Sequence, residues 1–273
     1  MKRRQFLLTG AALVPAWGFR FARADDALPT PEWDRLRATM FGTRPLATEG
    51  DAVPLLEVPA RAADAATVPV ALQSPFNQSA ARYVKTMYLV IDRNPTPLAA
   101  VFRFTPQSGR AELATRVRVE QYTFMRVIAE LNDDSLHLTS RFVKAAGGCS
   151  APASKDAAAA AANLGQMKLR VDEESASSGP RRARLMVRHP NTSGLAMDQL
   201  TRLYAKPHFV RELTVRYRGE PVLEAELTFA ISENPDFGFR FLPGDGGELE
   251  ARVVDTENLN FTSRVTVAGP AAS

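Results

Sequence analysis

The chain has 273 residues, with 34 lysines and arginines against 30 aspartates and glutamates and a formal net charge of +4. Five basic residues and no acidic ones lie in the first 24 positions, so removing that segment changes the net charge from +4 to −1, and nucleic-acid binding is not expected. A single cysteine excludes a disulfide framework, and the remaining length suffices for two ordinary domains.

Residues 1–24 have the pattern of an export signal. Adjacent Arg3 and Arg4 are followed by Phe6-Leu7-Leu8, and the apolar stretch ends at the small-x-small triplet Ala22-Arg23-Ala24. This order predicts a twin-arginine signal peptide that is cleaved near Ala24, which places the mature chain in the periplasm. The apolar stretch is shorter than the ~20 residues that a transmembrane helix needs, so we expect no membrane span.

One short helix is expected at the start of the mature chain. Thr30 fits an N-cap, and Pro31 fits the first helical position. One face of this helix carries three apolar side chains, Trp33, Leu36 and Met40. The helix is therefore predicted to pack against the elements that follow it.

Alternating apolar and polar residues then predict β-strands in two groups. The first group lies at 68–72, 83–92, 98–105, 113–119, 122–131 and 136–144, and the second at 184–188, 212–218, 221–231, 238–242, 248–254 and 261–267. The predicted fold is all-β, with two immunoglobulin-like β-sandwich domains at 25–146 and 181–273. Residues 147–180 are predicted to form a cysteine-bearing arm and a flexible Ala/Ser-rich linker.

A faint internal repeat accompanies the two groups of strands. Asp92-Arg-Asn-Pro95 and Ser232-Glu-Asn-Pro235 each precede a Phe-Arg-Phe or Phe-Gly-Phe-Arg-Phe segment. Two interpretations stay open: the halves are related folds, or Asn-Pro turns before aromatic strands recur by chance in β-proteins.

The sequence favours no catalytic or metal site. Its three histidines are His137, within a predicted strand, and His189 and His208, which lie next to prolines and are interpreted as turn residues. They do not form the clustered Cys/His motif of a common zinc site. The acidic pair Asp133 and Asp134 is interpreted as a solvated turn. No catalytic residue, metal or cofactor is therefore expected.

Cys149 is the residue that most requires a functional explanation. It follows Gly147 and Gly148 and precedes Ser150, just after a predicted strand. Small residues on both sides predict an exposed thiol on a flexible arm formed by Gly147, Gly148 and Ser150. The alternative is a small apolar core residue, which many free cysteines are. An exposed thiol with an ordinary pKa of about 8.5 would be reactive only as its minor thiolate form at neutral pH.

Several segments in this order resemble a known pair of proteins, the Y and Z subunits of the bacterial sulfur-oxidation (Sox) carrier complex, here joined in one chain. The Y-like segments are Val68-Pro-Val70, the stretch 90–99, Thr115-Arg-Val-Arg-Val119 and the strand leading to Gly147-Gly-Cys149. The Z-like segments are Arg188-His-Pro190, Ser193-Gly-Leu195, Pro207-His-Phe209 and the stretch 230–235 followed by Phe239. The pattern departs from the Y subunit after the cysteine, where Ser150-Ala-Pro152 replaces a free Gly-Gly terminus.

The resemblance implies a periplasmic, non-catalytic carrier that presents a covalent adduct to separate enzymes, as in thiosulfate oxidation, with Cys149 as the attachment site and no cofactor. Fused chains of this kind resemble the type associated with quinoprotein dehydrogenases, so the expected partners are periplasmic enzymes, with a quinoprotein dehydrogenase or a c-type cytochrome as candidates. Two alternatives stay open. The chain is an accessory or binding protein for a quinoprotein (PQQ) alcohol dehydrogenase in which Cys149 is incidental, or Cys149 forms an intermolecular disulfide.

Overall fold

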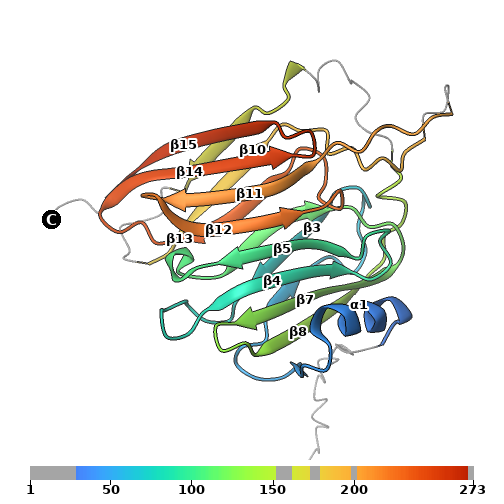
Figure 1. The fold of residues 1–273 in the computed structure, drawn as a ribbon, viewed down its shortest axis with the longest axis horizontal. Helices are drawn as coiled ribbons and strands as arrows, with labels where there is room; N and C mark the ends of the chain where they lie inside the picture. Colours follow the sequence, from blue (N-terminus) through green and yellow to red (C-terminus); the bar gives the residue numbers. More distant parts are fainter. Residues whose placement is uncertain (1–28, 152–161, 173–178, 198–201, 270–273) are drawn as a thin grey trace, which may run out of the picture.

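The computed structural model describes residues 29–151, 162–172, 179–197 and 202–269 (Figure 1). The predicted signal peptide at 1–24 lies outside these residues. The described part contains one α-helix, one short 3-10 helix and fifteen strands, which confirms the all-β prediction. No helix among these residues is long and apolar enough to cross a membrane.

In chain order the elements of the N-terminal half are α1 (Pro31–Phe41), β1 (Leu46–Ala47), β2 (Leu55–Glu57), β3 (Val68–Gln73), β4 (Val84–Ile91), β5 (Leu98–Phe104), η1 (Pro106–Ser108), β6 (Glu112–Val117), β7 (Thr123–Leu131) and β8 (Leu136–Val143). Those of the C-terminal half are β9 (Met167–Val171), β10 (Arg181–Val187), β11 (Val210–Tyr217), β12 (Glu220–Leu227), β13 (Asp236–Phe241), β14 (Gly246–Asp255) and β15 (Asn260–Ala268).

The strands form two sheets, and each sheet runs through both halves of the chain. The nine-stranded sheet has the order β1-β8-β7-β4-β5-β12-β11-β14-β15, and the six-stranded sheet has the order β2-β3-β6-β13-β10-β9. The halves meet where β5 pairs with β12 and where β6 pairs with β13. The two sandwiches are therefore joined strand to strand, as the neighbouring β5 and β12 in Figure 1 show, and not through a linker alone.

The hydrophobic core is shared by the two halves in the same way. On β13, Phe237, Phe239 and Phe241 alternate with more exposed residues and are each at most 1 % exposed. They belong to one apolar cluster that also contains Leu72 and Leu113 of the N-terminal half. Because burial of one such side chain stabilises a fold by ~1.5–3 kcal/mol, this common core holds the halves together in addition to the strand pairing.

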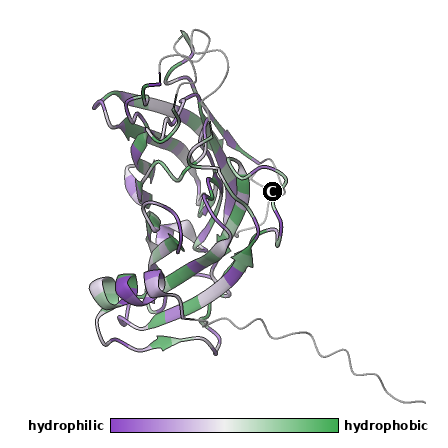
Figure 2. Cartoon of the chain, turned by 90° about the vertical axis from the view of Figure 1, so that its right-hand side faces the viewer, coloured by the Kyte–Doolittle hydropathy of each residue, from purple (hydrophilic) through white to green (hydrophobic). Residues whose placement is uncertain are grey.

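Helix α1 covers the outer face of the nine-stranded sheet. Its N-cap is Thr30, as predicted, because the Thr30 side-chain oxygen accepts a hydrogen bond from the Trp33 amide at 3.1 Å. Trp33 and Phe41 are buried in a second apolar cluster with residues of β4, β7 and β8, among them Ile128. Figure 2 shows α1 outside the sandwich, away from the space between the sheets. The prediction that the helix packs against later elements is therefore confirmed.

A buried ion pair lies beneath the start of α1. Arg126 and Asp92 are both fully buried and approach to 2.8 Å, and the Thr30 hydroxyl donates to the same Asp92 carboxylate at 2.7 Å. The Arg126 guanidinium also lies 4.9 Å from the Trp33 ring centre and 5.1 Å from that of Phe124. The pair therefore links the helix N-terminus to β7 and to the end of β4.

The linker prediction is wrong in part. Residues 167–171, inside the predicted linker, form β9, which pairs with β10 along five residues of each strand. The apolar residues Met167, Leu169 and Val171 have the period of two expected of a strand, and Leu169 is buried. A short strand at a sheet edge gives a weak local signal when its neighbours are rich in small and polar residues. Residues 152–161, which include most of the alanine run, lie outside the described residues.

The internal repeat does not occupy equivalent positions. Residues 92–95 connect β4 to β5 within the nine-stranded sheet, whereas residues 232–235 connect β12 of that sheet to β13 of the six-stranded sheet. The structure therefore favours the interpretation that the two Asn-Pro turns recur by chance.

The connections that carry the candidate functional residues share one end of the sandwich. In the nine-stranded sheet β8, β4, β12 and β14 alternate with strands of opposite direction, so their last residues lie at the same end. The segment that contains Cys149 follows β8, and Asp255 ends β14. The connection between β10 and β11 enters β11 at this end as well, because Val210, the first residue of β11, pairs with Asp255.

Candidate functional site

Cys149 is held against the chain segment that follows β6. The amide of Gly147 donates to the carbonyl of Glu120, and the amide of Gly148 donates to the carbonyl of the preceding Val119, both at 2.9 Å. Gly147 has a φ of +82°, which most other residues avoid. A Cβ atom on Gly148 would lie 2.0 Å from a backbone carbonyl oxygen. Gly147 therefore permits the backbone turn, and Gly148 permits the close approach of the two backbone segments.

The Glu120 carboxylate binds the residues after the glycines. Its Oε2 accepts the amides of Cys149 at 2.8 Å and Ser150 at 3.1 Å, and its Oε1 accepts the Ser150 hydroxyl at 2.8 Å. The prediction that Gly147, Gly148 and Ser150 form a flexible arm stays a prediction, while in the described structure all three residues are hydrogen-bonded. The segment is seated, because three hydrogen bonds to one carboxylate and two backbone bonds fix it in place.

The C-terminal half closes the seat from the other side. Ser193, in the connection between β10 and β11, donates its hydroxyl to the Cys149 carbonyl at 2.6 Å. Ser193 is itself 6 % exposed, and Cys149 is fully buried. The prediction of an exposed thiol is wrong, because Cys149 has no exposed surface in the described structure. We call the contacts of Glu120, Gly148 and Ser193 around this residue the Cys149 seat.

The seat suppresses the reactivity of the thiol. Burial first, and then the negative charge of Glu120, raise the pKa of Cys149 to about 12, against the lowering effect of Arg118. A thiol with that pKa is ionised in only about one molecule in 10⁵ at neutral pH, and the thiolate is the nucleophile. The seat also loses stability as the pH rises above the ordinary thiol value of about 8.5, because only the released thiol can then ionise. Cys149 must leave the seat to react.

Arg118 joins the seat to the C-terminal half. Its guanidinium donates to the carbonyls of Phe229 and Ile231 at 3.1 and 2.7 Å, and burial lowers its pKa. Asn94 fixes the same strand end from the other side, since it donates to the Arg118 carbonyl and accepts the Glu120 amide at 2.8 and 2.9 Å. The Glu120 carboxylate is thus presented by a segment with little freedom to move.

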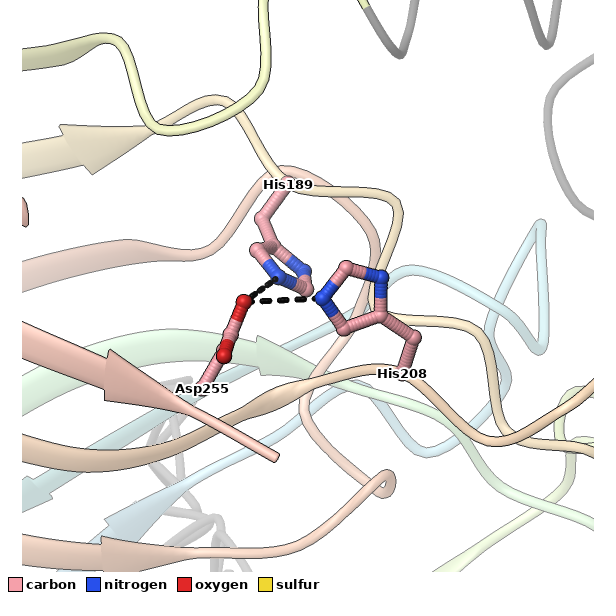
Figure 3. A group of neighbouring side chains, drawn as sticks. All are labelled: His189, His208 and Asp255. Atoms are coloured by element: carbon pink, nitrogen blue, oxygen red, sulfur yellow. Dashed lines mark hydrogen bonds and ion pairs between the residues drawn. The ribbon is translucent and has the colours of Figure 1, made fainter. Parts of the chain in front are cut away.

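A second group of polar side chains lies at the same end of the sandwich. His189 and His208, at the two ends of the connection between β10 and β11, both direct Nε2 at Oδ2 of Asp255, at 3.4 and 2.8 Å (Figure 3). The side chains of His189 and Asp255 are fully buried, and that of His208 is 18 % exposed. Sequence reasoning placed both histidines in turns and did not bring them together. One signal in the sequence could have indicated this pairing. His189-Pro190 and Pro207-His208 lie at the two ends of the same connection between strands.

The hydrogen bonds define the protonation of this group. Nδ1 of His189 accepts the Asn191 amide at 3.0 Å, so the ring proton lies on Nε2 and points at Asp255. Burial first, and then the neighbouring His208, lower the pKa of His189. Burial alone would raise the pKa of Asp255, but hydrogen bonds from His208, the Leu259 and Glu257 amides and His189 lower it. The described group is a carboxylate between two imidazole N–H donors.

The same geometry bears on metal binding. The three ligand atoms lie within 4.8 Å of one another, a spacing that a divalent cation could bridge. However, a histidine that binds a metal through Nε2 normally carries its proton on Nδ1 and donates it. Nδ1 of His189 faces the Asn191 N–H donor instead, so this imidazole is unsuited to a metal in its described orientation.

Comparisons with known families match the N-terminal and C-terminal halves of the chain separately. Residues 37–149 match the family described as sulfur oxidation protein SoxY, and residues 168–266 match the family described as sulphur oxidation protein SoxZ. The chain thus carries a domain that matches SoxY followed by a domain that matches SoxZ. Cys149 is the last residue of the SoxY match, and β9 lies within the SoxZ match apart from its first residue. Both matched families are described as sulfur-oxidation proteins, and the two matches lie in one polypeptide.

Solved structures with similar parts are distant. The sulfur carrier protein SoxY from Chlorobium limicola f thiosulfatophilum is 20 % identical, with a TM-score of 0.33, and the match covers 41 % of this chain and 90 % of that one. A superoxide reductase (neelaredoxin) from Ignicoccus hospitalis is 14 % identical, with a TM-score of 0.30 and coverage of 34 % and 80 %. Similarities this low do not indicate a shared chemistry. No curated protein matches the chain.

Proposed function

We propose that this chain is a periplasmic, non-catalytic carrier that holds a sulfur-containing intermediate covalently on Cys149 and presents it to partner enzymes. One observation carries the proposal: Cys149 ends the SoxY match and is seated where the SoxY and SoxZ domains meet. It is the only cysteine of the chain. The seat explains how a lone thiol persists unmodified in an oxidising compartment between rounds of loading.

Loading requires that the segment around Cys149 be released. On release the thiol regains its ordinary pKa of about 8.5, so the thiolate fraction at neutral pH rises from about 10⁻⁵ to a few per cent. The hydrogen bonds lost by Glu120 and Ser193 are replaced by water. The seat and the released state are thus an unreactive and a reactive form of the same residue.

The carrier proposal is tested by intact mass measurement of the protein purified from its native host. A mass increment that maps to Cys149 and is removed by a reductant is expected. The matched variant Cys149→Ser should lack the increment and should fail to support growth of the host on its sulfur or alcohol substrate. A bare thiol in the native protein, together with full function of Cys149→Ser, would refute the carrier role.

A second candidate is an accessory protein for a quinoprotein dehydrogenase in which Cys149 is incidental. The observation that favours it is the complete burial of the thiol, which is typical of a structural cysteine. Under this alternative Cys149→Ser keeps both partner binding and function. The same variant therefore separates the two candidates.

Export to the periplasm is part of the proposal and rests on the sequence of residues 1–24. The double variant Arg3→Lys/Arg4→Lys should leave the precursor in the cytoplasmic fraction, because the twin-arginine route recognises the arginine pair. A variant Lys2→Arg, which preserves the pair, is the control. Processing and periplasmic recovery of the double variant would contradict this route.

A further inference from the structure

The turn that carries Ser193 is fixed by a histidine. Ser193 binds the Cys149 carbonyl, and two residues before it Asn191 donates its amide to Nδ1 of His189 at 3.0 Å. The Asn191 side chain is fully buried and also donates to the Ile231 carbonyl at 3.2 Å. The His189 ring thus contributes to holding the turn that presents Ser193 to Cys149, together with the bonds of the Asn191 side chain to Ile231 and Val210.

His189 is hydrogen-bonded to the Asp255 carboxylate, each oxygen of which already accepts two hydrogen bonds. Oδ2 of Asp255 accepts Nε2 of His189 and of His208, and Oδ1 accepts the amides of Glu257 and Leu259, both at 2.9 Å. Both termini of the connection between β10 and β11 are thereby tied to the end of β14 (Figure 3). This arrangement makes the neutral His189 the form that fits.

A second proton on His189 has no acceptor in this structure. It would have to bind Nδ1, where the Asn191 amide already points its own proton. The charged and titratable groups around His189 are Asp255, and His208 with its ring centre at 4.6 Å. Glu257 comes within 4.0 Å of His208 and is paired with Lys206 at 3.1 Å. Burial and the neighbouring His208 lower the pKa of His189 in spite of Asp255.

We propose that His189 is a positioning residue whose protonation opens the turn to Ser193 and thereby releases Cys149 from its seat. The inference rests on the proposed carrier function, because it concerns access to the same thiol. The direction follows from linkage: His189 binds a proton more weakly in the seated state than in the released state, so acid favours release. The effect begins as the pH falls through the ordinary histidine value of about 6.5 and is absent well above it.

The test measures access to Cys149 against pH in the full chain. The rate of reaction with 4,4′-dithiodipyridine is divided by the rate for glutathione at the same pH, which removes the ordinary effect of pH on thiolate and reagent. For the wild type this ratio is expected to rise about fivefold or more between about pH 7.5 and about pH 5.5. A ratio that is constant or falls over this interval overturns the proposal.

Two glutamine variants separate the positioning role from general stability. His189→Gln keeps an amide donor for Asp255 but cannot titrate, so its ratio should lose the acid rise. His137→Gln is the matched control, because His137 lies on β8 at the opposite end of the sandwich and has no contact with the seat. It should keep the wild-type pH profile. An acid rise that persists in His189→Gln, with both variants folded by circular dichroism at each pH, overturns the proposal.

A further experiment, with a chelator and with added metal, tests whether metal binding at the same residues causes the pH dependence. The wild-type profile should be unchanged by EDTA and by added Zn²⁺, since the protonation of His189 alone governs the turn. A profile that EDTA abolishes overturns the proposal in favour of a metal switch. Failure of the carrier function appears elsewhere, as full activity of Cys149→Ser in the host, and leaves the pH profile of thiol access as it is.

Discussion

Replacement of Glu120 should convert the seated thiol of Cys149 into an accessible one. Glu120→Ala removes the acceptor of two backbone amides, those of Cys149 and Ser150, and of the Ser150 hydroxyl. A hydrogen bond to a charged group contributes ~1.5–3 kcal/mol, so loss of the two amide bonds alone destabilises the seat by about 3 kcal/mol. That is a factor of about 100 in the equilibrium between seated and released states.

The assay is the rate of reaction with Ellman's reagent at about pH 7.5, under conditions where the segment opens and closes faster than it reacts. The observed rate is then proportional to the released fraction, and Glu120→Ala should react about 100-fold faster than the wild type. Glu120→Gln, which keeps one acceptor oxygen without the charge, should lie between them. Glu224→Ala, on the exposed face of β12, is the control and should not change the rate. A rate for Glu120→Ala within about twofold of wild type would refute the reasoning.

Three further substitutions probe the seat, the buried ion pair and the shared core. Gly148→Ala should raise thiol reactivity about tenfold or more without lowering the melting temperature, because its Cβ would lie 2.0 Å from the Ala65 carbonyl oxygen; unchanged reactivity contradicts this. Arg126→Met should cost about 3–5 kcal/mol by leaving Asp92 buried without its charge partner, measured by urea unfolding. Phe239→Ala should cost a similar ~3–5 kcal/mol and unfold both halves in one transition, so two separate transitions would contradict a shared core.

Local patterns predicted the elements whose cause is local. The Thr30 cap and Pro31 start of α1 are in the structure as predicted, because a cap bonds to an amide three residues away. Strands such as β11 and β13 follow the alternation of apolar and polar residues. The prediction failed for β9, a five-residue edge strand paired with β10, whose short alternation lies in a stretch rich in small and polar residues.

The histidine group shows more clearly how local sequence and tertiary structure contribute different information. His189 and His208 are far apart in the chain, and each has a sufficient local explanation as a turn residue beside a proline. Their convergence on Asp255 depends on the order of β10, β11 and β14 in space. A sequence pattern of two histidines flanking one connection indicates where to look, but it does not supply the carboxylate.

The sequence by itself determined that this protein is an all-β chain with a single thiol, Cys149, at the boundary between a SoxY and a SoxZ domain. Only the tertiary structure decided the state of that thiol. Small residues around a cysteine allow it to be exposed, but they equally allow close backbone packing, and Gly148 is used for the second purpose. The groups that bury it, Glu120 and Ser193, come from 29 and 44 residues away, beyond the range of any local pattern.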